Sequence, residues 1–407
     1  MTEKAVETVQ ELFAQIIDLS RETPGQNRAV YSANWVAAQG LVIKFALAHG
    51  LQVMVDDLGT VYADLPGQTS SQVVATGSHI DTVTDGGRYD GLYGVLGGLQ
   101  AVLNLQKDAA RIQHTVRLIS FSEEEGSRFP TTFTGSKHYI KADQDLDLTD
   151  ENGVSFTAAK QGAVAKLQAI TGVSRGLPAV PACFTELHIE QGPRLELAHA
   201  QIGLVTAICG QRRFTIQVHG NANHAGTTPM DQRQDALLAA AKLIGKLHSL
   251  AGEVSDQLTF TVGQLNVLPN TVNVIPGQVN FTVDCRHDDE ETLNHYEQLL
   301  RQQVEQLGQR AGFHTEIERW AHDLPTHLDP QLLAANRKLA QELGLSQLEL
   351  ASGAGNDSEI MSRVTPTTMI FVPSIGGVSH APAEQTSVAD LQAGIALLTA
   401  SLQNLAF

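Results

Sequence analysis

One histidine and two aspartates stand at spacings that suit a metal site. In the stretch Val73–Asp90, His79 and Asp81 are separated by one residue, and Asp90 closes a glycine-rich turn. A neutral imidazole can bind a divalent cation through one nitrogen while a carboxylate fixes the proton on the other nitrogen. Asp90 has two carboxylate oxygens and could therefore bridge two cations. The alternative interpretation is a hydrogen-bonded core histidine beside an ordinary Asp-Gly turn.

Three consecutive acids follow a second apolar run. Glu123, Glu124 and Glu125 come shortly after the run 114–121. Carboxylates that are brought together repel one another and raise one another's pKa values unless cations or protons compensate. This cost favours a cation site, and a solvated turn is the alternative.

Two further histidines stand beyond predicted strands. His188 follows the apolar run 183–187, and His380 follows the run 367–372 and a glycine-rich loop. Together with His79, Asp90 and Glu125, they offer three imidazole nitrogens and two carboxylates. This set suits a pair of borderline divalent cations such as Zn²⁺ or Mn²⁺, with one carboxylate between them. The predicted ligands are His79, Asp90, Glu125, His188 and His380.

These ligands need strands that end at one place. Short apolar runs flanked by turns predict strands that are buried on both faces, as in a mostly parallel sheet. Open α/β sheets place their ligands at the carboxyl ends of such strands. The first run, 73–75, is expected to turn at 76–78 before it reaches His79. We therefore predict an α/β catalytic domain with a mostly parallel central sheet flanked by helices, among them residues 1–20 and 33–48.

The segment 210–320 alternates between apolar and polar residues, unlike the buried runs on either side. Its predicted elements follow the order β-α-β-β-α-β, a ferredoxin-like arrangement in which two helices cover one face of a sheet. The first helix is expected to begin at Asp231, which could cap it. We expect residues 1–209 and 321–407 to form the catalytic domain, with 210–320 inserted as the dimerisation domain of a homodimer.

Composition and charge disfavour several classes of partner. The chain has 407 residues and a formal net charge of −17. No nucleic acid and no membrane is therefore expected as a partner, since either would demand clustered Lys and Arg. The three cysteines, Cys183, Cys209 and Cys285, are far apart and match neither a disulfide framework nor a structural zinc site. Without a signal-peptide pattern or an apolar run of about 20 residues, a cytoplasmic location is expected.

Several sequence motifs carry a resemblance to a known family. They include GSHIDTV, SEEEGSRFP, ELHIEQGP, NHAGTTPM, DCRHDD and GGVSHAPAE. On these motifs the chain resembles the allantoate amidohydrolases, which belong to the amidase/hydantoinase-carbamoylase group of dinuclear metallo-exopeptidase-like amidohydrolases. The resemblance implies two divalent metal ions per subunit, preferably Mn²⁺, with Zn²⁺, Co²⁺ or Ni²⁺ as alternatives. It also implies that the inserted domain 210–320 closes over the substrate as a lid.

The resemblance also distributes the predicted ligands between the two metals. His79 and His188 would hold one metal. Glu125 and His380 would hold the other, and Asp90 would bridge the two.

Three further residues receive catalytic roles from the resemblance. Asp81 would orient the imidazole of His79. Glu124 would be the general base, which takes a proton from the hydrolytic water and later gives one to the leaving nitrogen. His224 would reach across the dimer into the other subunit's site and stabilise the oxyanion there.

The same resemblance implies a set of substrate contacts. Asn273 and Arg286 would hold a substrate carboxylate, the latter through its bidentate guanidinium. Gln191 would hydrogen-bond a ureido group. The expected partner is therefore a small ureido substrate that carries a carboxylate. The substrate-binding positions are Gln191, Gln211, His224, Asn273, Arg286 and Gly355.

One position departs from the family pattern. Where the family usually has Gly-Ala-Gly-His-Asp, this chain has Asn356 in place of the histidine. The expected reaction is hydrolysis of the carbamoyl C–N bond of allantoate to ammonia, carbon dioxide and ureidoglycine. The main competing function is that of an N-carbamoyl-L-amino-acid hydrolase. An exopeptidase of the same clan is disfavoured by the carbamoylase-like motifs, and an inactive ligand-binding protein on the same scaffold is disfavoured by the presence of every predicted ligand and of Glu124.

Overall fold

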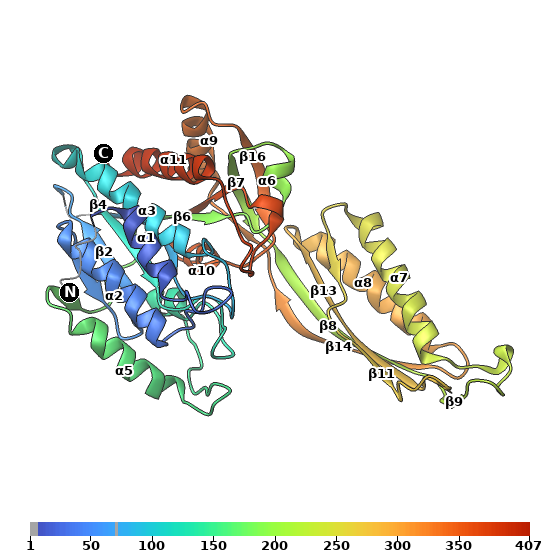
Figure 1. Cartoon of the computed structure of the whole chain (residues 1–407). Helices are drawn as coiled ribbons and strands as arrows, with labels where there is room; N and C mark the ends of the chain where they lie inside the picture. Colours follow the sequence, from blue (N-terminus) through green and yellow to red (C-terminus); the bar gives the residue numbers. More distant parts are fainter. Residues whose placement is uncertain (1–6, 70–71) are drawn as a thin grey trace. The chain divides into compact units, whose positions relative to one another are not determined.

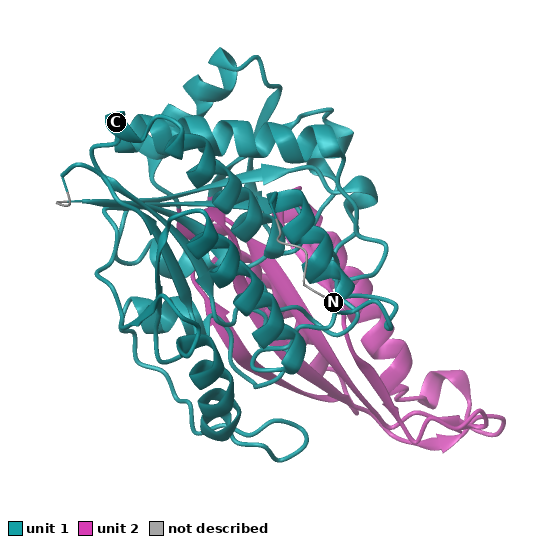
Figure 2. Cartoon of the chain, turned by 60° about the vertical axis from the view of Figure 1, so that its left-hand side comes forward, with its two compact units in different colours: residues 1–206, 328–407 teal, residues 207–327 magenta. Residues whose placement is uncertain are grey.

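The computed structural model describes residues 7–69 and 72–407, which form two compact units (Figure 1). The first unit comprises the residues up to Thr206 together with Leu328–Phe407, and the second comprises Ala207–His327 (Figure 2). The second unit thus begins at 207 rather than 210 and ends at 327 rather than 320. Each unit has a hydrophobic core of its own.

A ten-stranded sheet contains the parallel strands that the sequence predicts. Its middle strands, in the order β17, β6, β3 and β4, run parallel to one another. They comprise Thr367–Val372, Cys183–Ile189, Val73–His79 and Thr115–Phe121, respectively. The outer strands are β2 (Val61–Leu65), β1 (Gln52–Val55) and β5 (Val173–Arg175) beyond β4, and β7 (Ile202–Ile208), β15 (Thr326–His327) and β16 (Gln347–Ser352) beyond β17. The predicted α/β fold with a mainly parallel central sheet is confirmed.

Helices cover this sheet, and capping residues set where several of them begin. The Ser32 hydroxyl accepts a hydrogen bond from the Trp35 backbone N–H at 3.2 Å and caps α2 at the predicted place. Helix α1 lies within the predicted range 1–20, of which residues 1–6 are outside the described residues. The α-helices described in the first unit are α1 (Val9–Asp18), α2 (Ala33–Ala48), α3 (Leu92–Gln106), α4 (Thr134–Tyr139), α5 (Phe156–Gln168), α6 (Arg194–Leu197), α9 (Pro330–Glu342), α10 (Asp357–Met361) and α11 (Val388–Ala406).

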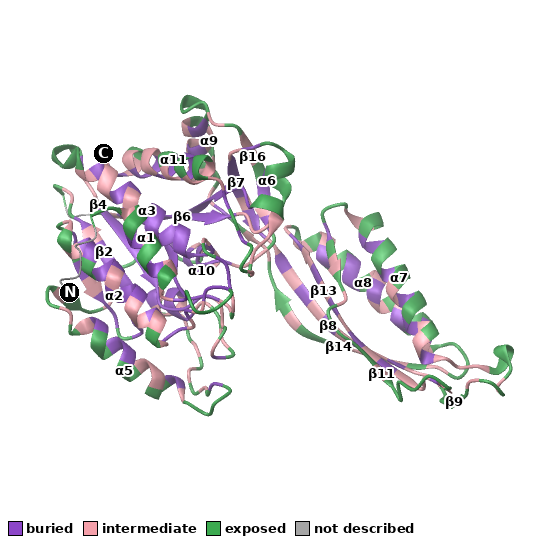
Figure 3. Cartoon of the chain, viewed as in Figure 1, coloured by how far each residue is buried: buried purple, intermediate pink, exposed green. Residues whose placement is uncertain are grey.

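Both faces of the parallel strands are buried, as the colouring of β6 shows (Figure 3). On β4, Val116 and Leu118 belong to the apolar cluster that includes residues of α3 and α11. Ile119 and Phe121 belong to a second cluster, with Tyr139 of α4 and Met361 of α10. Because successive side chains of a strand point to opposite faces, the two clusters are separate layers on either side of the sheet.

Strand β3 continues without a turn to His79, so the prediction of a turn after its first three residues is wrong. The buried hydroxyl of Ser78 donates a hydrogen bond to Glu186 Oε1 at 2.8 Å, which allows a polar residue within the strand. Gly77 is required by the close approach of β4, because a Cβ atom here would lie 2.0 Å from the Ile119 carbonyl oxygen. His79 is therefore held as the last residue of a buried strand.

The second unit is an antiparallel sheet with two helices packed on one face. On β8, Phe214, Ile216 and Val218 are buried among side chains of both helices, while the residues between them are half-buried. The sheet order is β10-β13-β8-β14, with β11 also paired to β13. The elements are β8 (Gly210–His219), α7 (Ala236–Val254), β10 (Thr259–Thr261), β11 (Leu265–Leu268), β13 (Gln278–His287), α8 (Glu290–Gly308) and β14 (His314–Asp323). This is the order β-α-β-β-α-β, with the second strand in two pieces.

The start of α7 differs from the prediction. Asp231 lies in a short 3-10 turn, and α7 begins at Ala236. Asp235 is the capping residue, because its carboxylate accepts a hydrogen bond from the Leu238 backbone N–H at 3.0 Å. Within the described residues, no helix has the length and apolar character needed to cross a membrane.

Candidate metal centre

The five predicted ligands meet in the first unit, where the parallel strands end. Carboxyl ends of neighbouring parallel strands lie at the same edge of a sheet, which brings residues distant in sequence together. His79 ends β3, His188 lies near the end of β6, Glu125 follows β4, Asp90 precedes α3, and His380 lies between β17 and α11. These residues form two overlapping groups of candidate ligand atoms, in each of which the atoms lie within 4.8 Å of one another.

The first group consists of His79, His188 and Asp90, all of which are buried. Asp90 Oδ1 lies 3.2 Å from His188 Nε2 and 3.8 Å from His79 Nε2. The His188 Nδ1 donates a hydrogen bond to the Ile189 carbonyl oxygen at 2.9 Å. This contact orients the ring and leaves Nε2 turned toward Asp90, as expected of a metal-binding histidine.

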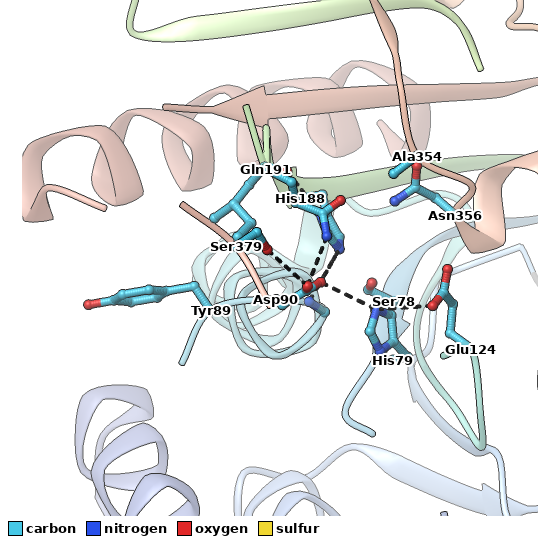
Figure 4. A network of polar contacts seen from close by, with 12 residues as sticks. Ser78, His79, Tyr89, Asp90, Glu124, His188, Gln191, Ala354, Asn356 and Ser379 are labelled. Carbon is cyan, nitrogen blue, oxygen red and sulfur yellow. Dashed lines mark hydrogen bonds and ion pairs between the residues drawn. The ribbon is translucent and has the colours of Figure 1, made fainter. Parts of the chain in front are cut away.

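The second group consists of Asp90, Glu125 and His380. His380 Nε2 lies 3.1 Å from Asp90 Oδ2 and 3.6 Å from Glu125 Oε2. Asp90 therefore presents one carboxylate oxygen to each group, and it occupies the middle of the contacts drawn in Figure 4. This position suits a carboxylate that bridges two cations.

Asp81 connects His79 to the acidic run after β4. The His79 Nδ1 lies 3.1 Å from the Asp81 carbonyl oxygen and 3.4 Å from its Oδ1. The Asp81 carboxylate also accepts hydrogen bonds from the backbone N–H groups of Glu124 and Glu125, each at 3.1 Å. Glu124 Oε2 lies 4.0 Å from His79 Nε2, and His79, Glu124 and Glu125 form a further group of candidate ligand atoms within 4.8 Å of one another. One buried carboxylate thus positions residues from two strands.

The charges of these groups test whether cations fit among them. Burial raises the pKa of Glu125 to about 7, and the neighbouring Asp90 carboxylate adds to this effect. The hydrogen bond to Asp90 raises the pKa of His380 to about 9. Burial opposes ionisation of Asp90, but hydrogen bonds from His188 and His380 hold its pKa well below the usual range. Carboxylates and imidazoles that share protons in this way can bind divalent cations such as Zn²⁺ or Mn²⁺ in place of the protons.

Two residues without a predicted role support Asp90. Glu384 is fully buried, and its Oε1 accepts hydrogen bonds from the backbone N–H groups of Tyr89 at 2.8 Å and Asp90 at 3.1 Å. The Ser379 hydroxyl lies 2.8 Å from Glu384 Oε2 and 3.2 Å from Asp90 Oδ2. Ser379 directly precedes His380 and Glu384 follows it by four residues, but no local pattern in the sequence indicates that either residue contacts Asp90.

Two of the predicted substrate contacts lie in the first unit. The Gln191 side-chain amide donates a hydrogen bond to Asp90 Oδ2 at 2.8 Å, which places it at the ligand groups (Figure 4). Gly355 is half-buried and precedes Asn356, which is 2% exposed. The Asn356 side-chain oxygen accepts a hydrogen bond from the Ser352 hydroxyl at 3.2 Å. Asn356 thus keeps a polar contact within its own loop.

The other predicted contacts lie in the second unit, as two pairs. Gln211 and Arg286 are opposite one another on β8 and β13, and both donate to the Asp284 carboxylate, at 2.8 Å and 3.0 Å. His224 and Asn273 form the second pair. Their segments are joined by a hydrogen bond from the Ala225 backbone N–H to the Asn273 carbonyl oxygen at 3.0 Å.

The ring of His224 has a defined orientation. Its Nδ1 accepts hydrogen bonds from the backbone N–H groups of Gly226 at 3.0 Å and Thr227 at 3.2 Å. A neutral imidazole with an accepting Nδ1 carries its proton on Nε2. The exposed His224 side chain therefore offers an Nε2–H donor, which is the group that an oxyanion requires.

An α/β sheet whose parallel strands end in two His/carboxylate groups that share one aspartate defines a hydrolase of the two-metal class. Residues 75–404 match Peptidase family M20/M25/M40, and the chain belongs to this family. The allantoate amidohydrolase of Bacillus subtilis is 39% identical over 94% of this chain and 93% of that protein. The N-carbamoyl-L-amino-acid amidohydrolase of Paenarthrobacter aurescens is 36% identical over 95% of each chain.

The fold agrees with a solved structure over nearly its whole length. The crystal structure of a hydantoinase/carbamoylase-family amidase from Burkholderia multivorans matches with a TM-score of 0.90 and 32% identity, and covers 98% of each chain. The family and these relatives confirm the predicted resemblance. The chain is a hydrolase of carbon–nitrogen bonds of the amide or carbamoyl kind.

Proposed function

We propose that the protein hydrolyses the carbamoyl C–N bond of allantoate and releases ammonia, carbon dioxide and ureidoglycine. The observation that carries the reaction type is the position of Asp90, which presents one oxygen to each ligand group beside Glu124. The choice of allantoate is supported by the identity of 39% to the Bacillus subtilis allantoate amidohydrolase.

The two ligand groups would hold two divalent ions. His79 and His188 would hold one ion, Glu125 and His380 the other, and Asp90 both. The bound ions, Mn²⁺ or alternatively Zn²⁺, Co²⁺ or Ni²⁺, would supply Lewis-acid activation of the carbonyl and of the attacking water.

Glu124 would move the protons of the reaction. Its carboxylate would take a proton from the attacking water and deliver it to the nitrogen that leaves as ammonia. The carbamate that remains would then lose carbon dioxide and give the amine of ureidoglycine. Burial raises the pKa of Glu124 well above its ordinary value, as is typical of carboxylates that exchange protons at neutral pH. Asp81 would fix the base indirectly, because it accepts the Glu124 backbone N–H at 3.1 Å.

The substrate would be held by the residues that the family resemblance implies. Gln191 would turn its amide toward the ureido group, and Gly355 would be a further contact. Arg286 would bind the carboxylate, for which the planar guanidinium offers a bidentate match, with Gln211 beside it. Asn273 lies with His224 beyond the other end of the β8–β13 ladder and would therefore reach the carboxylate from the partner subunit. The Arg286 guanidinium already forms this kind of contact with Asp284, whose two oxygens lie 3.0 Å from Nε and 3.1 Å from Nη2.

The active form would be a homodimer in which His224 of the partner subunit stabilises the oxyanion. Strand β11 supports a second copy of the chain as the partner, because it pairs with β13 alone among the described strands. Its side chains Leu265 and Leu268 are 49% and 53% exposed, and nearby Val272 is fully exposed. An apolar edge strand of this kind is normally covered by another chain.

An N-carbamoyl-L-amino-acid hydrolase is the second candidate function. It is supported by the 36% identity to the Paenarthrobacter aurescens enzyme. Asn356 replaces a histidine that is usual in the family as a whole and therefore favours neither substrate. Both substrates offer a ureido carbon and a carboxylate, so the proposed catalytic residues serve either one.

The two candidates are separated by an assay of ammonia release. The purified protein is stripped with a chelator, loaded with Mn²⁺ and offered allantoate and a panel of N-carbamoyl-L-amino acids at equal concentrations. We expect a higher kcat/KM for allantoate. A higher kcat/KM for a carbamoyl amino acid would contradict the proposal and make Asn356→His the first variant to test.

A further inference from the structure

A short segment before α2 packs against the loop that joins β3 to α3. Gln26 and Gly86 form an antiparallel bridge with two backbone hydrogen bonds of 2.9 Å. The Asn27 side-chain amide donates to Asp85 Oδ1 at 2.9 Å, and the Asp85 backbone N–H donates back to Asn27 Oδ1 at 3.0 Å. The loop that carries two site residues is therefore fixed along its length by a segment distant in sequence.

Arg28 belongs to this segment and is fully buried. Its Nε–H donates to the Ile80 carbonyl oxygen at 2.9 Å, and its Nη1 donates to Gln26 Oε1 at 2.6 Å. Its backbone N–H donates to the Thr82 hydroxyl at 2.9 Å. Nη2 has no hydrogen-bond partner among the described residues. A buried guanidinium with one nitrogen unpaired costs stability, so the hydrogen bond to the Ile80 carbonyl points to a role in positioning.

The carbonyl group that Arg28 holds lies between two site residues. Ile80 separates His79 from Asp81, and these two side chains contact one another at 3.4 Å. Asp81 in turn accepts the backbone N–H of Glu124. A rotation of the Ile80 peptide would therefore displace the His79 imidazole and the Asp81 carboxylate together. Glu124 would move with them, because its backbone N–H is bound by Asp81.

The positive charge of Arg28 disfavours metal binding, whereas its hydrogen bond to the Ile80 carbonyl is expected to favour it. Burial lowers the pKa of Arg28 to about 10, while Asp81, Glu384 and Asp90 act in the other direction, so the guanidinium stays protonated at neutral pH. A fixed positive charge near the site repels a cation. Removal of the charge alone would therefore tighten metal binding, whereas loss of the hydrogen bond to Ile80 would weaken it.

We propose that Arg28 is a positioning residue of the metal centre, which sets the relative orientation of His79 and Asp81 through the Ile80 carbonyl group. The inference rests on the proposed function in one respect, namely that His79 is a metal ligand. It does not depend on which ureido compound is the substrate.

The test is a Mn²⁺ titration of the metal-free protein, in which electron paramagnetic resonance measures the free ion. Arg28→Lys keeps the charge and loses the planar hydrogen-bonding fork, and Arg28→Met loses both. We expect Mn²⁺ affinity to fall about 10- to 100-fold in each variant, the range typical of groups that orient metal-binding histidines. Arg117→Met is the matched control, because Arg117 is buried in the same unit and pairs with Asp64 at 2.7 Å. This control is expected to bind Mn²⁺ with native affinity.

Native Mn²⁺ affinity in Arg28→Lys, or unchanged or tighter binding in Arg28→Met, would overturn the inference. If Arg28→Met does not fold, Arg28→Lys decides, since it keeps the charge and most of the side-chain volume. Failure of the native protein to bind Mn²⁺ would overturn the metal centre and the inference together. The other results would overturn the inference alone.

Discussion

At the scale of single residues, Asp90 has the central position because both ligand groups include it. Its two oxygens lie 3.2 Å from His188 Nε2 and 3.1 Å from His380 Nε2. A residue that bridges two ions affects the binding of both when it changes, whereas His188 or His380 affects one ion first. A substitution of Asp90 is therefore expected to weaken the binding of both ions, and a substitution of His188 or His380 that of one ion first.

Asp90→Asn is expected to lower the affinity for both metal equivalents. The amide keeps the shape of the side chain but loses the negative charge and one of the two oxygens. We expect a loss larger than the roughly 10- to 100-fold caused by removal of an orienting group. Equilibrium dialysis followed by elemental analysis measures the two equivalents.

Asp64→Asn is the control for this variant, since Asp64 pairs with Arg117 rather than with a ligand. It is expected to retain both metal equivalents. If Asp90→Asn retained one equivalent at native affinity, Asp90 would not be a bridge.

At the scale of elements, much of the candidate site could be predicted because its candidate ligands stand at the ends of strands or in the loops that follow them. Apolar runs are visible in a sequence, and a polar residue that ends such a run needs a reason to be there. The same rule failed inside β3, where Thr76 and Ser78 suggested a turn. Ser78 remains in the strand because Glu186, distant in sequence, accepts its hydrogen bond.

Glu384 and Arg28, which support the site, could not be predicted because their contacts are distant in sequence. Glu384 contacts the Asp90 backbone across 294 positions of sequence, and Arg28 contacts Ile80 across 52. Neither residue has a local pattern that reveals its partner. Such contacts are set by the packing of the whole unit, which only the structure provides.

The helix α7 provides a test of a local rule. Asp235→Ala is expected to lower the free energy of unfolding by about 1 kcal/mol, because the cap of the Leu238 backbone N–H is lost. Thermal and urea denaturation followed by circular dichroism measure the change. The matched control is Asp231→Ala, which removes the residue that the sequence alone favoured as the cap and should leave stability nearly unchanged. A larger effect from Asp231→Ala would show that Asp231 is the cap after all.

At the scale of the whole molecule, the proposed dimer makes catalysis depend on two chains. His224 would act in the site of the partner subunit, whereas Arg286 would act in that of its own subunit. Light scattering is expected to give twice the mass of the 43.7 kDa chain. A fully active monomer would contradict the shared site.

Mixed dimers test the same proposal through activity. His224→Ala and Arg286→Ala are each expected to be nearly inactive. If the two are mixed equally and their subunits exchange, a hybrid dimer has one complete site, and about a quarter of native activity is expected. No recovery, with exchange shown by mass spectrometry, would place both residues in one subunit's site.

The most direct test of the account is Glu124→Gln, measured for metal content and for ammonia release from allantoate in the same preparation. Glutamine keeps the volume of the side chain but cannot take up a proton. We expect two metal equivalents per chain, as in the native protein, and turnover reduced by about 100- to 10,000-fold, the usual contribution of a general base. Native turnover with unchanged metal content would contradict the assignment of Glu124 as the base.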